Sequence, residues 1–223
     1  MSAAKKEITV KLPEVDFKLL TVKLTGETPL VTCPFSIKQM QKIEDKQQGK
    51  AKTQKHEIRN PWEDFICALY WLTPPPLEFS EEAFNSAIEN GARFGFHVGG
   101  VKNSAIMAAY RRGLVKNAVT ARGLFQIIDT EQDFLYKKTC VEIISDAPPK
   151  MRKDCLSTFS SGADMRYRPQ FDNWSIEINV KYDAGTVSPE QLLMWFQLGG
   201  FACGLGENRQ EKGEGWGAYC LAN

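Results

Sequence analysis

The C-terminal fifty residues carry the pattern that most restricts the fold of this chain. The alternating segment WSIEINVKY at 174–182 predicts a strand with its apolar residues on one face. The next segment, SPEQLLMWFQLGGFACG, predicts a capped helix over 189–203. WGAYCLA predicts a closing strand over 216–222. The chain must therefore pass from a helix into a strand, and the composition of that connection is unusual.

The connection is rich in glycine. It reads GLGENRQEKGEGWG from 204 to 217 and follows Gly199 and Gly200, in a chain with 17 glycines. Glycine is favoured where the backbone takes a positive φ or where another group approaches it closely. Exposed amides in such a loop can bind phosphate, and Arg209 and Lys212 add positive charge. A flexible hairpin is the alternative. A P-loop or dinucleotide-binding loop is excluded, because both motifs run from strand to helix.

The rest of the chain predicts an α+β protein. Strands are expected over 17–31, with breaks at Gly26 and Pro29, and at LFQIID and KTCVEIIS. Helices are expected to begin at Ser36, at Asn60–Pro61 and at Ser80, and another is expected around 104–112. The segment from 148 to 173 shows no clear period, so we expect an irregular connection there.

The organisation along the chain indicates one domain. No internal repeat and no linker interrupt the sequence, and 43% of the residues are hydrophobic, enough for a substantial core. We therefore expect a single domain over 1–223, with an extended N-terminal arm over 1–16. Residues from about 91 to 160 are expected to form a long basic insertion.

Composition excludes several classes of site. The six cysteines form no CxxC pair, and His56 and His97 are far apart in sequence, so neither a zinc site nor any other metal or organic cofactor is expected. No segment approaches the roughly 18 apolar residues of a membrane span. The N-terminus lacks the apolar core of a signal peptide. These features are typical of a cytoplasmic protein that does not contact a membrane.

Charge is segregated along the chain, although the formal net charge is only +1. Lys and Arg outnumber Asp and Glu by seven to three over 36–59, by five to none over 101–122 and by five to two over 150–168, whereas 60–90 holds six acidic residues and no basic one. Three basic segments with neighbouring aromatic residues favour a face that binds nucleic acid, because cations neutralise phosphates and aromatic rings stack on unpaired bases. Solvated loops are the alternative for each segment.

The candidate binding residues come from these segments and from the glycine connection. Phosphate contacts are expected from Lys50, Lys52, Lys55, Arg59, Arg111, Arg112, Lys116, Arg122, Arg166, Arg168, Arg209 and Lys212. Tyr167 and the backbone at Gly204, Gly206, Gly213 and Gly215 complete the candidate site. In an extended segment Arg166 and Arg168 point to the same side. We expect both arginines to bind phosphate; the alternative is that they form salt bridges with the acidic helices of 60–90. Valine at Gly206 or Gly215 is expected to weaken binding more than folding.

The helix, the loop of the form GxG…GxGxG and the terminal strand resemble the RAMP superfamily of CRISPR-associated RNA-binding proteins. The combination of TPLV…F, RYRP…W and GFACGLGENRQEKGEGWG also resembles a group of uncharacterised phage and prophage proteins with a GIGEWRPEKGG-like C-terminus, in which tryptophan often stands where this chain has Asn208. The resemblance implies a ferredoxin-like, RRM-like fold, an antiparallel sheet with helices on one face. It also implies non-catalytic binding of single-stranded RNA or DNA by many aligned copies, with the arm 1–16 packed on a neighbour.

Two other functions stay open. A phage structural or host-interaction protein would use the basic face to bind an acidic protein. A metal-independent ribonuclease would use His56 or His97 as general base, since histidine titrates near neutral pH. The carboxylate pairs Glu63–Asp64 and Glu81–Glu82 instead indicate helix N-termini. No catalytic constellation is predicted.

Overall fold

The structure, a computed structural model, describes residues 15–50, 58–158 and 162–222. This part of the chain is a mixed α+β protein with antiparallel sheets and six α-helices. The helices are α1 (Ile37–Gln47), α2 (Pro61–Cys67), α3 (Glu81–Glu89), α4 (Val98–Arg111), α5 (Ala118–Arg122) and α6 (Pro189–Ala202), and a 3-10 helix covers Gln210–Lys212. The strands are β1 (Phe17–Gly26), β2 (Leu30–Val31), β3 (Tyr70–Trp71), β4 (Phe94–His97), β5 (Phe125–Ile128), β6 (Glu131–Gln132), β7 (Thr139–Ser145), β8 (Lys150–Thr158), β9 (Gly162–Phe171), β10 (Trp174–Asp183) and β11 (Tyr219–Leu221).

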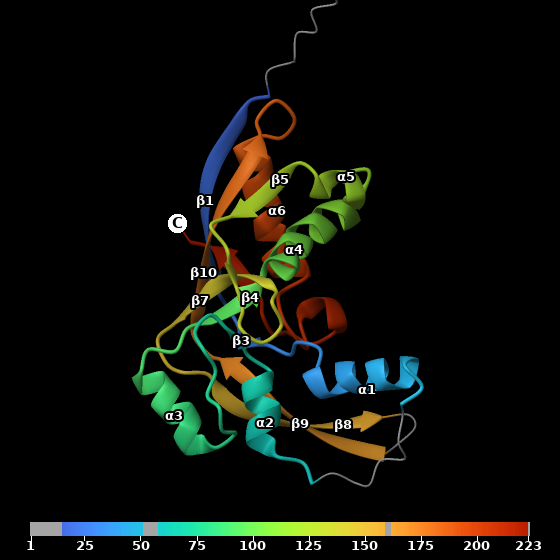
Figure 1. Ribbon diagram of the computed structural model, residues 1–223. Helices are drawn as coiled ribbons and strands as arrows, with labels where there is room; N and C mark the ends of the chain where they lie inside the picture. Colours follow the sequence, from blue (N-terminus) through green and yellow to red (C-terminus); the bar gives the residue numbers. More distant parts are fainter. Residues whose placement is uncertain (1–14, 51–57, 159–161, 223) are drawn as a thin grey trace, which may run out of the picture.

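The larger sheet has β10 at its centre. Its order is β11-β1-β10-β7-β4-β3, with β5 paired to one end of β10 and β6 paired to β7. Strand β10 buries alternate residues from Trp174 to Tyr182, which is the period that its sequence predicts. Helices α4 and α6 lie together on one face of this sheet (Figure 1).

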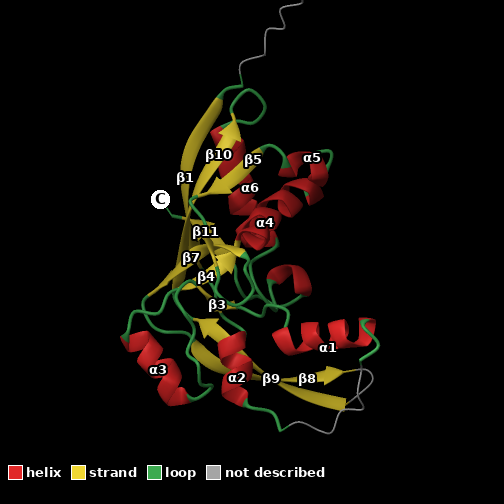
Figure 2. Ribbon diagram, in the orientation of Figure 1, coloured by secondary structure: helices red, strands yellow, loops and turns green. Residues whose placement is uncertain are grey.

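The smaller sheet has the order β2-β9-β8 and lies at the other end of the molecule, beside α1 and α2 (Figure 2). Its hairpin β8–β9 corrects the prediction of an irregular connection over 148–173. Arg152 and Asp154 pair along β8, and Asp164 and Arg166 pair along β9, so charged residues occupy positions that an amphipathic strand fills with apolar ones. A ribbon of this kind gives no alternating apolar signal.

One hydrophobic core joins the two sheets. Leu30 and Phe171 of the smaller sheet belong to the same buried cluster as Trp174 and Ile176 of β10. The segment 91–160, expected as an insertion, contributes β4, β5, β6 and β7 to the larger sheet and β8 to the smaller one. Its helix α4 buries Val101, Ser104, Ala105, Ile106, Ala108 and Ala109, so much of this segment lies within the packed core.

The C-terminal elements agree closely with the sequence. Strand β10 and helix α6 fall where they are expected, and the closing strand is shorter, at Tyr219–Leu221. Ser188 and Gln191 form a reciprocal capping box at the start of α6. The N-terminal helices begin as predicted, with Asn60 and Ser80 accepting hydrogen bonds from the first turns of α2 and α3. Helix α2 ends at Cys67, because the chain then enters β3.

Two glycines of α6 allow three elements to pack at close range. A Cβ at Gly199 would lie 2.9 Å from the Ala105 nitrogen of α4, and a Cβ at Gly200 would collide with the Tyr219 carbonyl of β11. The Tyr219 hydroxyl hydrogen-bonds to Ser104 Oγ at 2.7 Å in the same buried region. Glycine is therefore required here by packing between backbones.

This packing predicts that Gly200→Ala is destabilising. The added methyl group meets a backbone atom that cannot rotate away, so we expect a loss of about 1–3 kcal/mol or more in the free energy of unfolding, measured by urea denaturation. Gly215→Ala is the matched control, because the nearest atom to its Cβ is Gln210 Oε1 at 4.0 Å. Equal stability of the two variants would contradict the packing role.

Candidate nucleic-acid interface

The glycine loop, which we define as residues 203–218, folds back on its own chain. Gly204, Gly206, Gly213 and Gly217 take positive φ values between 64° and 88°. A Cβ at Gly206 would collide with the Val31 carbonyl oxygen of β2, and one at Gly217 would collide with the Leu205 carbonyl oxygen. The expectation that valine at Gly206 would affect binding more than folding is therefore wrong, because both the φ and this contact forbid a side chain. Gly215 has open space around it, so the expectation still stands there.

Several amides of the loop are also used within the chain. Leu205 N–H donates to Gly217 O at 2.8 Å, Glu207 N–H to Val31 O at 2.9 Å and Gly217 N–H to Pro29 O at 2.8 Å. The amides of Lys212 and Gly213 close the 3-10 turn. These donors hold the shape of the loop and do not point to a phosphate. The prediction that exposed amides of this loop bind phosphate therefore fails for these five donors.

A carboxylate between two arginines fixes the loop along α4. Arg111, at the end of α4, donates to Glu211, and Arg209 donates to the same carboxylate with Nε at 3.0 Å. Arg209 also donates to Gly206 O at 3.0 Å. Burial raises the pKa of Glu211, but the hydrogen bonds from Arg111 and Arg209 outweigh it and hold the pKa below its usual value. Two arginines expected on phosphate therefore stabilise the loop.

Cavity 1, of about 310 Å³, lies between the glycine loop and the N-terminal half of α4. Its walls include four of the predicted residues, Arg122, Gly204, Gly206 and Arg209. The other walls come from the aromatic cluster of Tyr70, Phe96 and His97, from Asn103, Ser104 and Met107 of α4, and from the loop residue Glu207. Neither Tyr70 nor Glu207 stands out in the sequence as a candidate binding residue.

Cavity 2, of about 750 Å³, lies between the start of α1, α2 and strand β9. It brings together four predicted residues, Arg59, Arg166, Tyr167 and Arg168. The exposed ring of Phe35 forms another part of its wall. The two cavities adjoin, because Cys33 and Glu207 line both of them. Together they form one groove that passes from the N-terminus of α4 along the glycine loop to β9.

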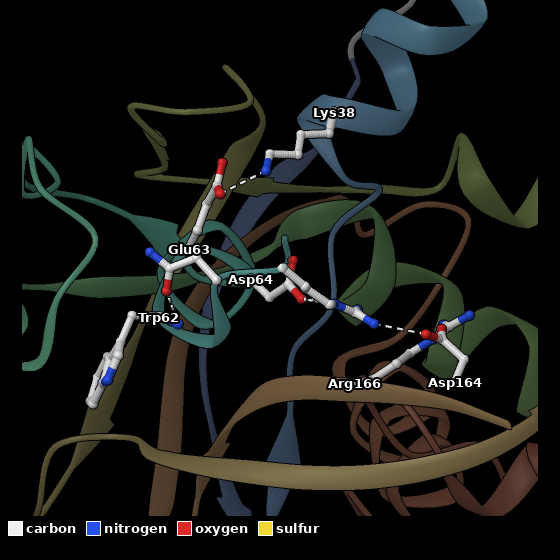
Figure 3. Close-up of polar contacts among 8 residues, drawn as sticks. Lys38, Trp62, Glu63, Asp64, Asp164 and Arg166 are labelled. Atoms are coloured by element: carbon white, nitrogen blue, oxygen red, sulfur yellow. Dashed lines mark hydrogen bonds and ion pairs between the residues drawn. The ribbon is translucent and has the colours of Figure 1, made fainter. Parts of the chain in front are cut away.

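Carboxylates balance the arginines of cavity 2. Arg59 pairs with Asp64 and, at 2.7 Å, with Asp164, and Asp164 also accepts from Arg166 at 3.3 Å. Lys38 pairs with Glu63 at 2.6 Å. Figure 3 shows these side chains converging from α1, α2 and β9. Arg59 thus pairs with the acidic helix α2. The alternative that Arg166 and Arg168 pair with the acidic helices of 60–90 is wrong, because Arg166 pairs with Asp164 of its own strand and Arg168 lies beside Asp154 of β8.

Arg168 is not a surface residue. Its side chain is 2% exposed, and its NH1 lies 3.6 Å from Asp154 Oδ2. Arg166 and Arg168 line the same cavity, as an extended segment predicts, but their exposure differs: the Arg166 side chain is 41% exposed. The prediction that Arg168 contacts phosphate at the surface is therefore corrected, because β8 and β9 bury it beside Asp154.

The remaining predicted residues lie away from the groove or beyond the described ranges. Lys50, Arg112, Lys116, Lys212, Gly213 and Gly215 line neither cavity. Lys52, Lys55 and His56 fall outside the described residues. The predicted site is thus assembled only in part, and its assembled members are those near the glycine loop and β9.

His97 acts as the N-cap of α4. Its Nδ1 accepts a hydrogen bond from Gly100 N–H at 2.9 Å. Burial, with the positive charges of Lys138 and Arg209, lowers the pKa of His97 below its ordinary value. At neutral pH the ring is therefore neutral and, because Nδ1 is an acceptor, its proton lies on Nε2. A ring in this state is a hydrogen-bond donor on its free nitrogen and a poor general base.

No group of three or more His, Cys, Asp or Glu side chains in the described ranges can hold a metal ion. Within the same ranges no helix is long and apolar enough to cross a membrane. No protein-family model matches the chain, and no curated protein matches it significantly. The functional assignment therefore depends on the groove itself.

The cap predicts a specific dependence of stability on pH. The pKa of His97 is lower in the folded protein than in the unfolded chain, where it is near 6.5. As the pH falls, the unfolded chain therefore protonates His97 before the folded protein does. The contribution of neutral His97 to the free energy of unfolding is therefore complete above about pH 6.5. It is lost as the pH falls below that value, by at most about 1.4 kcal/mol per pH unit. We expect a smaller loss between pH 7.5 and 5 for His97→Asn, which keeps a capping oxygen. Urea unfolding of both proteins checks this, and parallel pH profiles would contradict it.

Proposed function

We propose that this protein binds single-stranded nucleic acid, without cleaving it, in the groove formed by cavities 1 and 2. The observation that carries the proposal is that two segments selected from sequence, the glycine loop and the RYR segment of β9, line adjoining cavities. Phe35 and Tyr167 supply ring faces for unpaired bases. Arg122 and Arg166, both partly exposed, lie within reach of phosphates.

We also propose a ferredoxin-like core of RAMP type. Support comes from the chain order β1, α4, β5, β10, α6, β11, which is the β-α-β-β-α-β order of that fold. The strands β11, β1, β10 and β5 lie side by side, and both helices cover one face. The glycine loop then connects the second helix to the last strand, as in the resemblance. Alignment of many copies on one strand, with the arm 1–16 on a neighbour, belongs to the same proposal.

The alternatives have less support. An acidic protein partner requires a basic face, but Arg59, Arg111, Arg166, Arg168 and Arg209 are paired with carboxylates of this chain. A ribonuclease with His97 as general base requires a free Nδ1 or an unprotonated Nε2, and the cap leaves neither. His56 lies outside the described residues.

The stacking role predicts that Phe35→Ala weakens binding. Loss of one base–aromatic contact costs about 1–3 kcal/mol, so the Kd for a fluorescent 20-nucleotide RNA or DNA should rise about 5- to 150-fold in anisotropy titrations. Phe201→Ala is the control, because this ring is 68% exposed and lines neither cavity. If the wild-type protein binds no single strand even at low salt, the proposed function is lost.

The paired arginines predict a shallow salt dependence. Each phosphate contact to a single strand contributes about −0.7 to the slope of log K against log salt. Twelve contacts would give a slope near −8, whereas contacts from Arg122 and Arg166 alone predict a slope of about −1.4. Titrations between 50 and 300 mM NaCl measure this slope. A value near −8 would show that the ion pairs open to bind phosphate.

A further inference from the structure

Cavity 1 contains polar groups that the fold leaves unused. Tyr70 is 8% exposed, lines this cavity and has no hydrogen-bond partner for its hydroxyl among the described residues. Burial raises its pKa, so the hydroxyl keeps its proton and acts as a donor. The small exposed part of this residue faces the cavity, so its hydroxyl can donate a hydrogen bond to a ligand that enters there.

A second donor stands next to this phenol. The Tyr70 and His97 rings are 5.7 Å apart between centroids, and both line the cavity. Because His97 Nδ1 accepts from Gly100, the other nitrogen carries a proton and is free to donate. Phe96, whose ring lies 4.8 Å from that of His97, is 3% exposed and adds an apolar contact to the same wall.

The matching acceptor is Glu207 of the glycine loop. Its carboxylate lines both cavities and pairs with no cation within the described part of the chain. Its backbone is fixed between Gly206 and Asn208, which have φ values of 75° and 49°, and by the hydrogen bond from its amide to Val31 O. The loop thus holds one acidic residue at a defined place in the wall of the cavity that the two donors also line.

A carboxylate close to two donors matches one nucleobase better than the others. Guanine alone has two adjacent N–H donors, N1–H and N2–H, which one carboxylate can accept together, and it has acceptors at O6 and N7. Adenine and cytosine present a ring-nitrogen acceptor beside their amino group. The lone pair of that nitrogen would face the lone pairs of the carboxylate and be repelled. Uracil offers a single N–H between two carbonyls. The cavity volume of about 310 Å³ lies at the lower end of small-ligand pockets.

We propose that cavity 1 is a guanine-selective base pocket. Glu207 accepts from N1–H and N2–H, the Tyr70 hydroxyl and His97 Nε2–H donate to O6 and N7, and Phe96 packs against the base. The pocket is the base-reading part of the groove and in that sense rests on the proposed function. It adds what that function lacks, a preference for one base.

The test uses 12-nucleotide RNAs of uridine with one central guanosine, adenosine or inosine, and U12 as reference. We expect guanosine to bind about 10- to 100-fold more tightly than adenosine. Inosine, which lacks the N2 amine, should fall between them. In Glu207→Gln the ratio of guanosine to adenosine affinity should shrink below about threefold, and an unchanged urea unfolding midpoint shows that the fold is kept, because glutamine has the same shape. In Tyr70→Phe the same ratio should fall.

The outcomes separate the base pocket from the proposed function. If U12 binds but guanosine gives no gain, or if Glu207→Gln keeps the preference, the pocket is overturned and strand binding stands. Calorimetry with GMP and AMP covers the free nucleotide: GMP binding without RNA binding keeps the guanine pocket and removes the single-strand function. If no RNA and no GMP binds, both are overturned.

Discussion

The packing of Gly199 and Gly200 against α4 and β11 is the constraint on which the rest of the structure depends. The absence of side chains lets the α6 backbone approach Ala105 and Tyr219 directly, and the buried Tyr219–Ser104 hydrogen bond closes the contact. Because α6 is held against α4 at this point, the loop that leaves α6 must run along α4 before it reaches β11. The position of the glycine loop, and of cavity 1 beneath it, follows from this contact.

The same loop is fixed at its two sides by different interactions. At the end of α4, Arg111 and Arg209 share Glu211. At β2, the Val31 carbonyl accepts from Glu207 and leaves no room for a Cβ at Gly206. A loop with this many glycines would lose much conformational entropy on folding. The ion pairs and backbone contacts offset that cost, which explains why the glycines give a defined shape.

The last fifty residues, which form β10, α6 and β11, can be predicted well from sequence. Alternation in β10 and the capping residues of α6 are local signals, and the structure confirms both. The hairpin β8–β9 could not be predicted, because charged residues that pair along each strand occupy its alternate positions and leave no apolar period. Arg168 illustrates the same limit: its type and spacing are those of an exposed cation, and only the burial of its strand shows otherwise.

The residues of the candidate site likewise fall into those that the sequence marks and those that it does not. Sequence reasoning finds the glycine loop and the RYR segment, because composition marks them. It misses Tyr70 and Glu207, because a tyrosine in an aromatic segment and a glutamate in a loop are common and their significance arises from tertiary contact. Tyr70 lies in β3, far from the glycine loop in sequence, and only the tertiary fold brings the two to the same cavity.

The charge balance of the groove bears on the kind of recognition it can perform. A groove of unpaired cations attracts any polyanion and distinguishes strands poorly, because phosphate contacts carry no sequence information. Here the arginines of cavity 2 are paired with carboxylates, and cavity 1 presents a carboxylate with two neutral donors. Under the proposed function, such a groove would favour a base edge that supplies N–H donors. The free energy of that binding would come chiefly from stacking and base hydrogen bonds, which would favour selectivity for a base over affinity for any strand.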